Sequence, residues 1–224
     1  MHRTTIQLFA KAPVAGTVKT RLCPPFSPVE AATFYARLVE HAAVVVGMAR
    51  DRLRGEGTDA VAELWCAPDT AHPFLRDVAQ RHGLQLRRQR DGDLGTKMRD
   101  ALGSAMPGSA VLLGSDVPAL DVNRLVASAH ALSTDDVVII PADDGGYALI
   151  GCRRQVPDCF DGIAWSTSTV MDETRKRLDT RGLRLTTLSP VWDVDTSADL
   201  RRLANDPDLS HLASELKTVV VAEA

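Results

Sequence analysis

The stretch AVLLGSDVPALDVNRLVASAHAL, residues 110–132, carries the pattern that decides the fold. Its first five residues, Ala110–Gly114, show no polar alternation, which is typical of a strand covered on both faces in a parallel sheet. Asp121 then stands at an N-cap position, directly before the helical pattern VNRLVASAHAL. A buried strand followed by a capped helix is half of a β-α-β unit, so this stretch predicts an α/β protein.

The same alternation of apolar runs and amphipathic stretches continues along the 224 residues. The predicted strands are, in chain order, Thr5–Ala10, Ala60–Cys66, Leu84–Arg88, Ala110–Gly114, Val137–Pro141, Tyr147–Cys152, Arg184–Leu188 and Val191–Val194. Repeated β-α-β units imply one open, mostly parallel sheet with helices on both faces. Because no internal repeat or linker interrupts the pattern, we predict a single domain over residues 1–224.

Start and stop signals mark the helices between these strands. Ser27 opens a capping box, with proline at the first helical position, for a helix that runs through residues 31–50. Gly83 is placed to end the next helix, and Thr196 to cap the last one. We interpret Arg54–Thr58, the loosest stretch, as a surface loop and not as a domain boundary.

The bulk composition excludes several classes of protein. A formal net charge of −3 argues against nucleic-acid binding, which depends on a surplus of Lys and Arg. The first residues contain too few consecutive apolar positions for a signal peptide, and no run could span a bilayer. The four cysteines show no CxxC or Cys/His pairing, so neither zinc nor disulfides are expected. We therefore expect a cytoplasmic protein with reduced thiols and no membrane partner.

The first candidate ligand site is the loop KAPVAGTVKTRL, residues 11–22, which follows the first predicted strand. In open α/β sheets, ligands bind beyond the carboxyl ends of the strands. Lys11, Lys19 and Arg21 surround Gly16 in this loop, an arrangement suited to a polyanionic phosphate. The loop is neither a Walker loop nor a GxGxxG turn, and a plain basic surface loop is the alternative.

Two acidic positions predict a metal site. Asp116 follows the buried strand described above, where a carboxylate is costly without a positive partner. Mg²⁺ is a natural partner, because it takes one or two protein carboxylates and completes its shell with phosphate oxygens and water. Asp193 and Asp195 point to the same side of the strand predicted over residues 191–194, and Asp195 would supply the second carboxylate. The alternatives are a helix cap for Asp116, a role that Asp121 already fills, and a plain strand-to-helix turn for Asp195.

Two further loops are candidates for the acceptor side. PADDGGY, residues 141–147, places adjacent acids before Gly145 and Gly146, which would let an acceptor approach the backbone closely. A tight turn is the structural alternative for these glycines. WSTST, residues 165–169, offers hydroxyl and backbone N–H groups at the start of a helix, where a carboxylate or phosphate can bind. Ordinary N-capping is the alternative there.

Six motifs become specific when they are taken in order. They are FAKAPVAGTVKTRL, GDLGTKM, LLGSDVPAL, PADDGGYALIG, FDGIAWSTSTV and DVDTSADL, and they extend over about residues 5 to 204. In this combination the chain resembles a bacterial family of GT-A-type transferases, often named as glycosyltransferases associated with radical SAM and selenodomain proteins. That family resembles the wider nucleotide-diphospho-sugar transferase superfamily, which includes the guanylyltransferases of molybdenum cofactor and of phospholactate. The resemblance implies a GT-A, Rossmann-like fold with a mostly parallel sheet flanked by helices on both faces.

The resemblance also implies roles for individual residues. Asp116 takes the position of the metal-binding aspartate and Asp195 that of a late second ligand, for Mg²⁺ or Mn²⁺. Lys19 and Arg21 would hold the donor's phosphates. The other donor-side positions are Lys11, Gly16, Gly95 and Ser115, and the acceptor-side positions are Asp144, Gly145, Gly146, Ser166 and Thr167. The chain departs from the family at Ala15 and Val117, where proline and cysteine are usual, and it lacks the glycine-rich opening of molybdenum-cofactor-type guanylyltransferases.

These roles fit two reactions and one binding function. In nucleotidyl transfer, Lys19 and Arg21 would offset charge on a leaving pyrophosphate while a small phosphorylated or carboxylate-bearing acceptor attacks in line. In glycosyl transfer from a nucleotide-sugar, an acceptor hydroxyl would need a base, for which Asp144 is the candidate. The third hypothesis is a nucleotide-binding module without turnover. We favour the first, because of the DVDTSADL ending and the compact length.

Two smaller expectations complete the sequence-based picture. Asp116→Ala is expected to leave the fold intact, because removing one of two metal-site acids relieves their mutual repulsion. The segment DPDLSHLASELKTVVVA, residues 206–222, is predicted as an amphipathic helix that packs on the sheet or on a second subunit. A homodimer is therefore one of the expected states.

Overall fold

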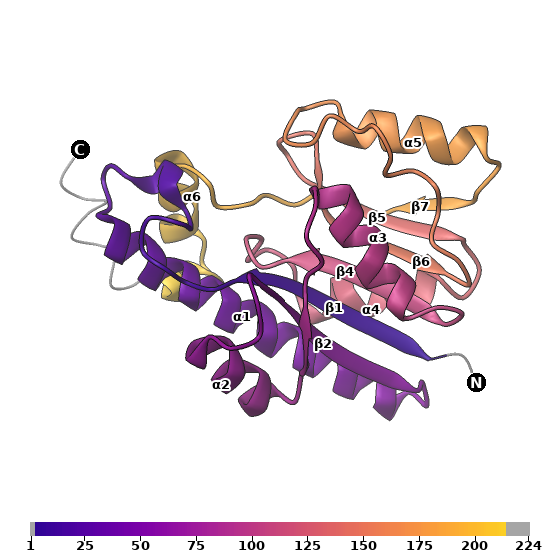
Figure 1. Cartoon of the computed structure of the whole chain (residues 1–224), viewed down its shortest axis with the longest axis horizontal. Coiled ribbons are helices and arrows are strands. Elements are labelled where there is room, and N and C mark those ends of the chain that lie inside the picture. Colours follow the sequence, from indigo (N-terminus) through magenta and orange to yellow (C-terminus); the bar gives the residue numbers. More distant parts are fainter. Residues whose placement is uncertain (1–2, 214–224) are drawn as a thin grey trace.

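The computed structural model describes residues 3–213, which form a seven-stranded sheet with helices on both faces (Figure 1). The strands are β1 (Thr4–Lys11), β2 (Ala60–Ala67), β3 (Gln85–Arg88), β4 (Ser109–Gly114), β5 (Val137–Pro141), β6 (Tyr147–Arg153) and β7 (Leu185–Thr187). Their order across the sheet is β3-β2-β1-β4-β6-β5-β7. β6 runs antiparallel to β4 and β5, and the other neighbours are parallel. The predicted fold class is therefore confirmed.

Helices pack on both faces of this sheet. They are α1 (Pro28–Gly55), α2 (Pro73–His82), α3 (Leu94–Ser104), α4 (Val122–Ala131), α5 (Val170–Thr180) and α6 (Ser197–Asn205), with the 3₁₀ helices η1 (Thr20–Leu22) and η2 (Ser210–Ala213). On one face, α1, α2 and α4 contribute side chains such as Val39, Leu75 and Leu125 to a hydrophobic cluster with the strands. On the other face, α3 and α5 contribute Met98 and Met171 to a second cluster. The sheet is thus covered on both sides, as its apolar strands require.

A third hydrophobic cluster lies away from the sheet, beside the start of α1. It combines Leu22 and Phe26, which precede α1, with Phe34 of α1 and with Val194 and Leu200 from the segment around the start of α6. Figure 1 shows this late segment leaving the sheet and crossing to the part of the molecule where α1 begins. Because the loop after β1 and the segment before α6 share this cluster, it fixes their positions relative to each other.

The predicted helix signals are present as contacts. The Ser27 hydroxyl accepts from the Glu30 N–H and the Glu30 carboxylate accepts from the Ser27 N–H, which completes the capping box at the start of α1. The Asp121 carboxylate accepts from the Arg124 N–H at 2.7 Å at the start of α4. Gly83 ends α2 in the left-handed conformation, with φ 64. These local signals therefore locate the starts of α1 and α4 and the end of α2.

The eighth predicted strand, Val191–Val194, is wrong. Val191 forms a single isolated bridge with Ala142, and the chain then turns away from the sheet. Val191 is buried against the first cluster, whereas Trp192 and Val194 are buried in the third. Burial against helices therefore produced an apolar pattern that resembles a strand but has no hydrogen-bonded ladder.

Two other expectations need adjustment. α1 continues through Gly55, so the loop predicted over Arg54–Thr58 is shorter than expected. Of the helix predicted over residues 206–222, Ser210–Ala213 forms η2, and the part from residue 214 onward lies outside the described residues. Within residues 3–213, no helix is long and apolar enough to cross a membrane.

Candidate functional site

The carboxyl ends of β1 and β4 meet the first residues of β6 at one edge of the sheet, because β6 runs antiparallel to β4. A cavity of about 620 Å³ lies there. Its lining includes Lys11 at the end of β1, Asp116 just beyond β4 and Tyr147 at the start of β6. This is the edge at which open α/β sheets bind their ligands.

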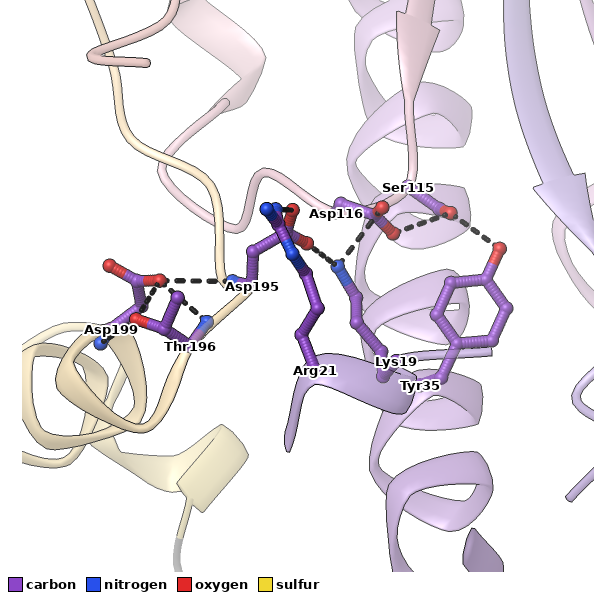
Figure 2. A network of polar contacts seen from close by, with 8 residues as sticks. All are labelled: Lys19, Arg21, Tyr35, Ser115, Asp116, Asp195, Thr196 and Asp199. Carbon is purple, nitrogen blue, oxygen red and sulfur yellow. Dashed lines mark hydrogen bonds and ion pairs between the residues drawn. The ribbon is translucent and has the colours of Figure 1, made fainter. Parts of the chain in front are cut away.

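The ammonium group of Lys19 lies between two carboxylates at this edge (Figure 2). Lys19 Nζ is 3.0 Å from Oδ2 of Asp116 and 2.7 Å from Oδ1 of Asp195. The Lys19 side chain is 4% exposed, whereas that of Asp116 is 43% exposed and faces the cavity. Arg21, which is 76% exposed, adds a contact of 3.4 Å to the other oxygen of Asp195. The two predicted metal ligands therefore converge, but in this structure they converge on a lysine of the same chain.

These contacts shift the ionisation of the paired groups. Burial lowers the pKa of Lys19, but the carboxylates of Asp116 and Asp195 outweigh burial and hold this pKa above its ordinary value. Burial raises the pKa of Asp195, but the positive charges and hydrogen bonds of Lys19 and Arg21 outweigh burial and hold this pKa below its ordinary value. The expectation that removing Asp116 relieves repulsion is wrong, because the Lys19 ammonium already bridges the two acids.

The loop that carries Lys19 is held by short-range hydrogen bonds and by one buried anchor. Thr17 donates both its N–H and its hydroxyl to the carbonyl of Val14, and Gly16 between them takes a φ of 80°. Lys19 is the N-cap of η1 with φ 49, a left-handed conformation that costs a non-glycine residue roughly 1–2 kcal/mol. Leu22, at the other end of η1, is fully buried in the third cluster. The buried anchor therefore holds the short helix that presents Lys19.

Asp195 is placed by the turn that begins α6. The Asp199 carboxylate accepts from the N–H groups of Asp195 at 3.1 Å and of Thr196 at 2.7 Å, and it forms a capping box with Thr196. One residue earlier, the Val194 N–H donates to the backbone carbonyl of Asp116 at 3.0 Å. The two acids are therefore joined through the main chain as well as through the shared ammonium group.

A buried tyrosine that no local sequence motif marks supports Asp116 (Figure 2). Tyr35 of α1 accepts from the Lys11 N–H at 2.9 Å, and its hydroxyl lies 2.9 Å from Ser115 Oγ. Ser115 donates to Asp116 Oδ1 at 3.4 Å, which makes Tyr35 the donor to Ser115. Burial, with the charge of Asp116 adding to it, raises the pKa of Tyr35 and keeps its hydroxyl protonated. This hydrogen-bonded chain joins the end of β1 to the end of β4.

The predicted site residues divide into those that line the cavity and those that do not. Lining residues are Lys11, Lys19, Arg21, Ser115, Asp116, Asp195 and Ser166, and the others are Gly16, Gly95, Asp144, Gly145, Gly146 and Thr167. Two of the glycines have packing reasons. A Cβ on Gly145, where φ is 89°, would overlap the carbonyl oxygen of Ser168. A Cβ on Gly95 would lie 2.8 Å from the ring of Trp165. These glycines allow close contact with the segment before α5.

That segment uses much of its own hydrogen-bonding capacity. The hydroxyls of Thr167 and Thr169 donate within the segment and to α5. The N–H of Met171, in the first turn of α5, donates to the carbonyl of Gly145 at 2.9 Å. Ser166 takes a left-handed conformation, with φ 65, and lines the cavity. Of the two residues predicted to bind an anion in this segment, Ser166 lines the cavity and Thr167 does not.

The cavity lining also includes Gln89 and Lys97, which were not predicted. Gln89 is buried, and its amide nitrogen donates to the carbonyls of Ala10 at 3.3 Å and Trp65 at 2.8 Å. Lys97 lies on α3 and adds a further cation to the lining. Lys97 belongs to the motif GDLGTKM, so a cation at that motif position was an available signal, whereas Gln89 stands in no motif.

Asp193 differs from the other acids of this region. Burial raises its pKa, and the charges of Asp195 and Asp144 add to this effect, so that the pKa reaches about 6. A carboxyl group with such a pKa can accept and release a proton near neutral pH. The predicted strand that would put Asp193 and Asp195 on one side is absent, and of these two acids Asp195 is the one that forms an ion pair with Lys19.

The donor set at this edge fits a metal that arrives with a phosphate. Among residues 3–213, no group of three or more His, Cys, Asp or Glu side chains could hold a metal ion. Mg²⁺ needs only one or two protein carboxylates when phosphate oxygens and water complete its shell. Asp116 and Asp195 already contact one ammonium group, so the two carboxylates converge on a single cationic position.

Comparison with solved structures places this fold among known transferases. The chain is similar to a protein from Desulfovibrio desulfuricans G20, provisionally named a nucleotide-diphospho-sugar transferase, with 28% identity, a TM-score of 0.79 and coverage of 98% of this chain and 97% of the other. It is similar to 4-diphosphocytidyl-2C-methyl-D-erythritol synthase from Anaerococcus prevotii DSM 20548, with 10% identity, a TM-score of 0.54 and coverage of 96% and 99%. It is also similar to glucosyl-3-phosphoglycerate synthase from Mycobacterium tuberculosis, solved with Mn²⁺ and UDP. The identity is 13%, the TM-score is 0.50, and the match covers 95% of this chain and 79% of the other. No curated protein matches significantly.

The mixed sheet and its neighbours define the class of fold, which is the GT-A type of nucleotide-diphospho-sugar and nucleotidyl transferases. The chain belongs to the family described as "Uncharacterized protein conserved in bacteria (DUF2064)", whose sequence profile matches residues 54–167. The matched stretch contains Asp116 and Ser166 and lies between the loop of Lys19 and the turn of Asp195.

Proposed function

We propose that this chain is a metal-dependent transferase that takes a nucleotide donor, and that it transfers a nucleotidyl group to a small acceptor bearing a phosphate or carboxylate. The main support is the Lys19 ammonium between Asp116 and Asp195, at the edge of a cavity of about 620 Å³. Arg21 and Lys11 line the same cavity. Clustered cations suit phosphates, and paired carboxylates suit a metal that phosphates carry.

The chain's own residues would bind and orient the donor. Lys11, Lys19 and Arg21 would hold its phosphates and oppose the negative charge that develops on a leaving pyrophosphate. Asp116 and Asp195 would hold Mg²⁺ or Mn²⁺, which when bound supplies positive charge against the same phosphates. Phosphoryl-type transfers depend mainly on positioning and electrostatic stabilisation, so an ionised acceptor needs little help from a base.

The extent of the structural match supports nucleotidyl transfer over glycosyl transfer. The fold of this chain covers 99% of the Anaerococcus prevotii synthase but 79% of the glucosyl-3-phosphoglycerate synthase. It therefore corresponds to nearly the whole of the first enzyme and leaves part of the second unmatched. The association with radical SAM and selenodomain proteins, the cytoplasmic location and the homodimer remain predictions, as do the acceptor-side roles of Asp144, Gly145, Gly146, Ser166 and Thr167.

Glycosyl transfer is the second candidate, because one observation favours it. An acceptor hydroxyl must lose a proton, and the raised pKa of Asp193, about 6, suits a general base near neutral pH. Asp144, the base predicted from the sequence, uses Oδ1 to accept from the Gly146 N–H at 2.9 Å. Neither Asp193 nor Asp144 lines the cavity, so this alternative reaction has less support than the phosphate and metal contacts of the first.

Ligand-dependent stabilisation tests the proposal. Thermal unfolding is measured with Mg²⁺ and each nucleoside triphosphate, nucleoside diphosphate and sugar nucleotide. A ligand at a hundred times its Kd adds about 2.7 kcal/mol, which raises the Tm of a chain of this size by roughly 5–10 °C. Asp116→Asn is expected to remove the metal-dependent part of that rise. Asp121→Asn is the matched control, because asparagine also caps α4 and Asp121 lies outside the cavity lining.

The released product separates the two candidate reactions. Pyrophosphate released from a triphosphate supports nucleotidyl transfer, and nucleoside diphosphate released from a sugar nucleotide supports glycosyl transfer. An unchanged metal-dependent rise in Asp116→Asn would refute the metal site in both.

A further inference from the structure

The Lys19 ammonium occupies the position that a bound cation would take between Asp116 and Asp195. It contacts one oxygen of each carboxylate, at 3.0 and 2.7 Å. The side chain is 4% exposed, so these carboxylates have largely replaced water around the ammonium group. The protein without ligand therefore already compensates the charge of its metal-site acids with a residue of its own.

A divalent cation cannot join this arrangement unless Lys19 moves. A metal held by the same two carboxylates would lie within about 4 Å of the ammonium group, and charges of one sign repel strongly at that distance where water is scarce. Arg21 does not present the same obstacle. It is 76% exposed and contacts Oδ2 of Asp195, the oxygen that Lys19 does not contact. Occupancy by metal and occupancy by Lys19 are therefore mutually exclusive.

Lys19 can leave by a movement of its side chain alone. Leu22 holds η1 in the third cluster, while the lysine side chain is a flexible four-carbon stem. The cavity beside it is lined by Lys11, Arg21 and Lys97, which would attract a phosphate. The displaced ammonium group of Lys19 could then form an ion pair with that phosphate.

We propose that Lys19 is the resident counter-ion of the free site, and that metal and donor phosphate bind together by displacing it, so that metal takes the two carboxylates while the ammonium moves to a phosphate oxygen. This inference rests on the proposed function, because the receiving phosphate belongs to the nucleotide donor. It implies that the metal alone binds weakly and that phosphate raises the affinity for the metal.

Titration with Mn²⁺ alone tests the exchange without any turnover. Free Mn²⁺ is followed by electron paramagnetic resonance in the wild type, Lys19→Met and Lys97→Met. Lys19→Met is expected to bind Mn²⁺ at least about tenfold more tightly than the wild type, because the competing charge is gone. Lys97→Met removes the same charge from the same cavity without freeing a carboxylate pair, and is expected to change the affinity less than about threefold. Equal affinities in the two variants would overturn the inference.

Lysine reactivity in the wild type tests the same movement without a substitution. The protein is acetylated with acetic anhydride, with and without saturating Mn²⁺, and the rate at each lysine is read by mass spectrometry. Lys19 is expected to react slowly in the free protein and several-fold faster once Mn²⁺ releases it, with Lys97 as the internal reference. Continued protection of Lys19 in the Mn²⁺-bound protein would contradict the exchange.

The two proposals fail in different ways. If nucleotide and metal stabilise the wild type while Lys19→Met gains no Mn²⁺ affinity, the transferase proposal stands and the exchange is wrong. If Lys19→Met binds Mn²⁺ tightly while no nucleotide raises the Mn²⁺ affinity of the wild type, the competition between Lys19 and the metal stands, and both the joint binding with a phosphate and the donor assignment are wrong.

Discussion

The Tyr35 hydroxyl joins the end of β1 to the end of β4 by hydrogen bonds, and Tyr35→Phe removes this hydroxyl. β4 ends at Gly114, which pairs with Phe9 of β1. Because β4 stops there, it offers no carbonyl group to the N–H of Lys11. The Tyr35 hydroxyl accepts from this N–H at 2.9 Å and donates to Ser115 at 2.9 Å. The variant therefore loses two hydrogen bonds and leaves one partly buried N–H without an acceptor.

The expected loss follows from these contacts. The hydrogen bond to Ser115 contributes about 1 kcal/mol, and the Lys11 N–H that is left without an acceptor costs roughly 1–3 kcal/mol, so Tyr35→Phe should lower the free energy of unfolding by about 2–4 kcal/mol. Tyr147→Phe is the matched control. Within the described part of the chain the buried Tyr147 hydroxyl interacts with the buried hydroxyl of Thr174, but in a geometry too poor for a hydrogen bond. Its removal is expected to change the free energy of unfolding by less than about 0.5 kcal/mol, or to raise it.

Urea unfolding followed by far-ultraviolet circular dichroism measures both variants, and an unchanged m value shows that the midpoints report stability. The Mn²⁺ affinity in the presence of a bound nucleotide should also fall in Tyr35→Phe, because Ser115 loses the partner that orients it toward Asp116. A loss no larger than that of Tyr147→Phe would refute the view that Tyr35 holds this edge together.

Two other substitutions follow from the same region. Gly145→Ala should lower the free energy of unfolding by about 3 kcal/mol or more, because the new Cβ meets the Ser168 carbonyl in a left-handed turn. Gly16→Ala is the control, because Gly16 has a similar φ of 80° but open space around it. It should lower the free energy of unfolding by about 1 kcal/mol in the same urea assay. Asp193→Asn should raise the free energy of unfolding by about 1–2 kcal/mol at pH 8 and by much less at pH 4. The folded pKa of Asp193, about 6, lies above the unfolded value, so wild-type stability falls as pH rises through this window. A pH-independent effect of Asp193→Asn would contradict this assignment.

Most of the fold could be predicted because its signals are local. Ala110–Gly114 and Val137–Pro141 are apolar on both sides, and the structure places β4 and β5 within a residue of these bounds. The stretch Val191–Val194 misled for a physical reason: Trp192 and Val194 are buried by helices and not by neighbouring strands. An apolar pattern indicates that a segment is buried, but it does not indicate whether strands or helices bury it.

The candidate site was predictable at the level of which residues meet, but not how they pair. Lys19 and Asp116 follow β1 and β4, so their place beyond the carboxyl ends of these strands follows from topology. Asp195 was expected there from a strand that is absent, and it reaches the site through the segment that crosses to the start of α1. The direct contact of Lys19 with Asp195 spans 176 residues, and no spacing rule connects such positions. Tyr35 was missed because it stands in the middle of α1, where an aromatic residue reads as core.

The late crossing segment has a consequence for synthesis on the ribosome. A nascent chain that has emerged as far as Thr187 contains every strand of the seven-stranded sheet, yet it lacks Asp195 and the side chains that fix its turn. Until that last stretch emerges, Lys19 has one acid to pair with instead of two. The sheet can thus form before the carboxylate pair around Lys19 is complete, because Asp195 follows all seven strands in the chain.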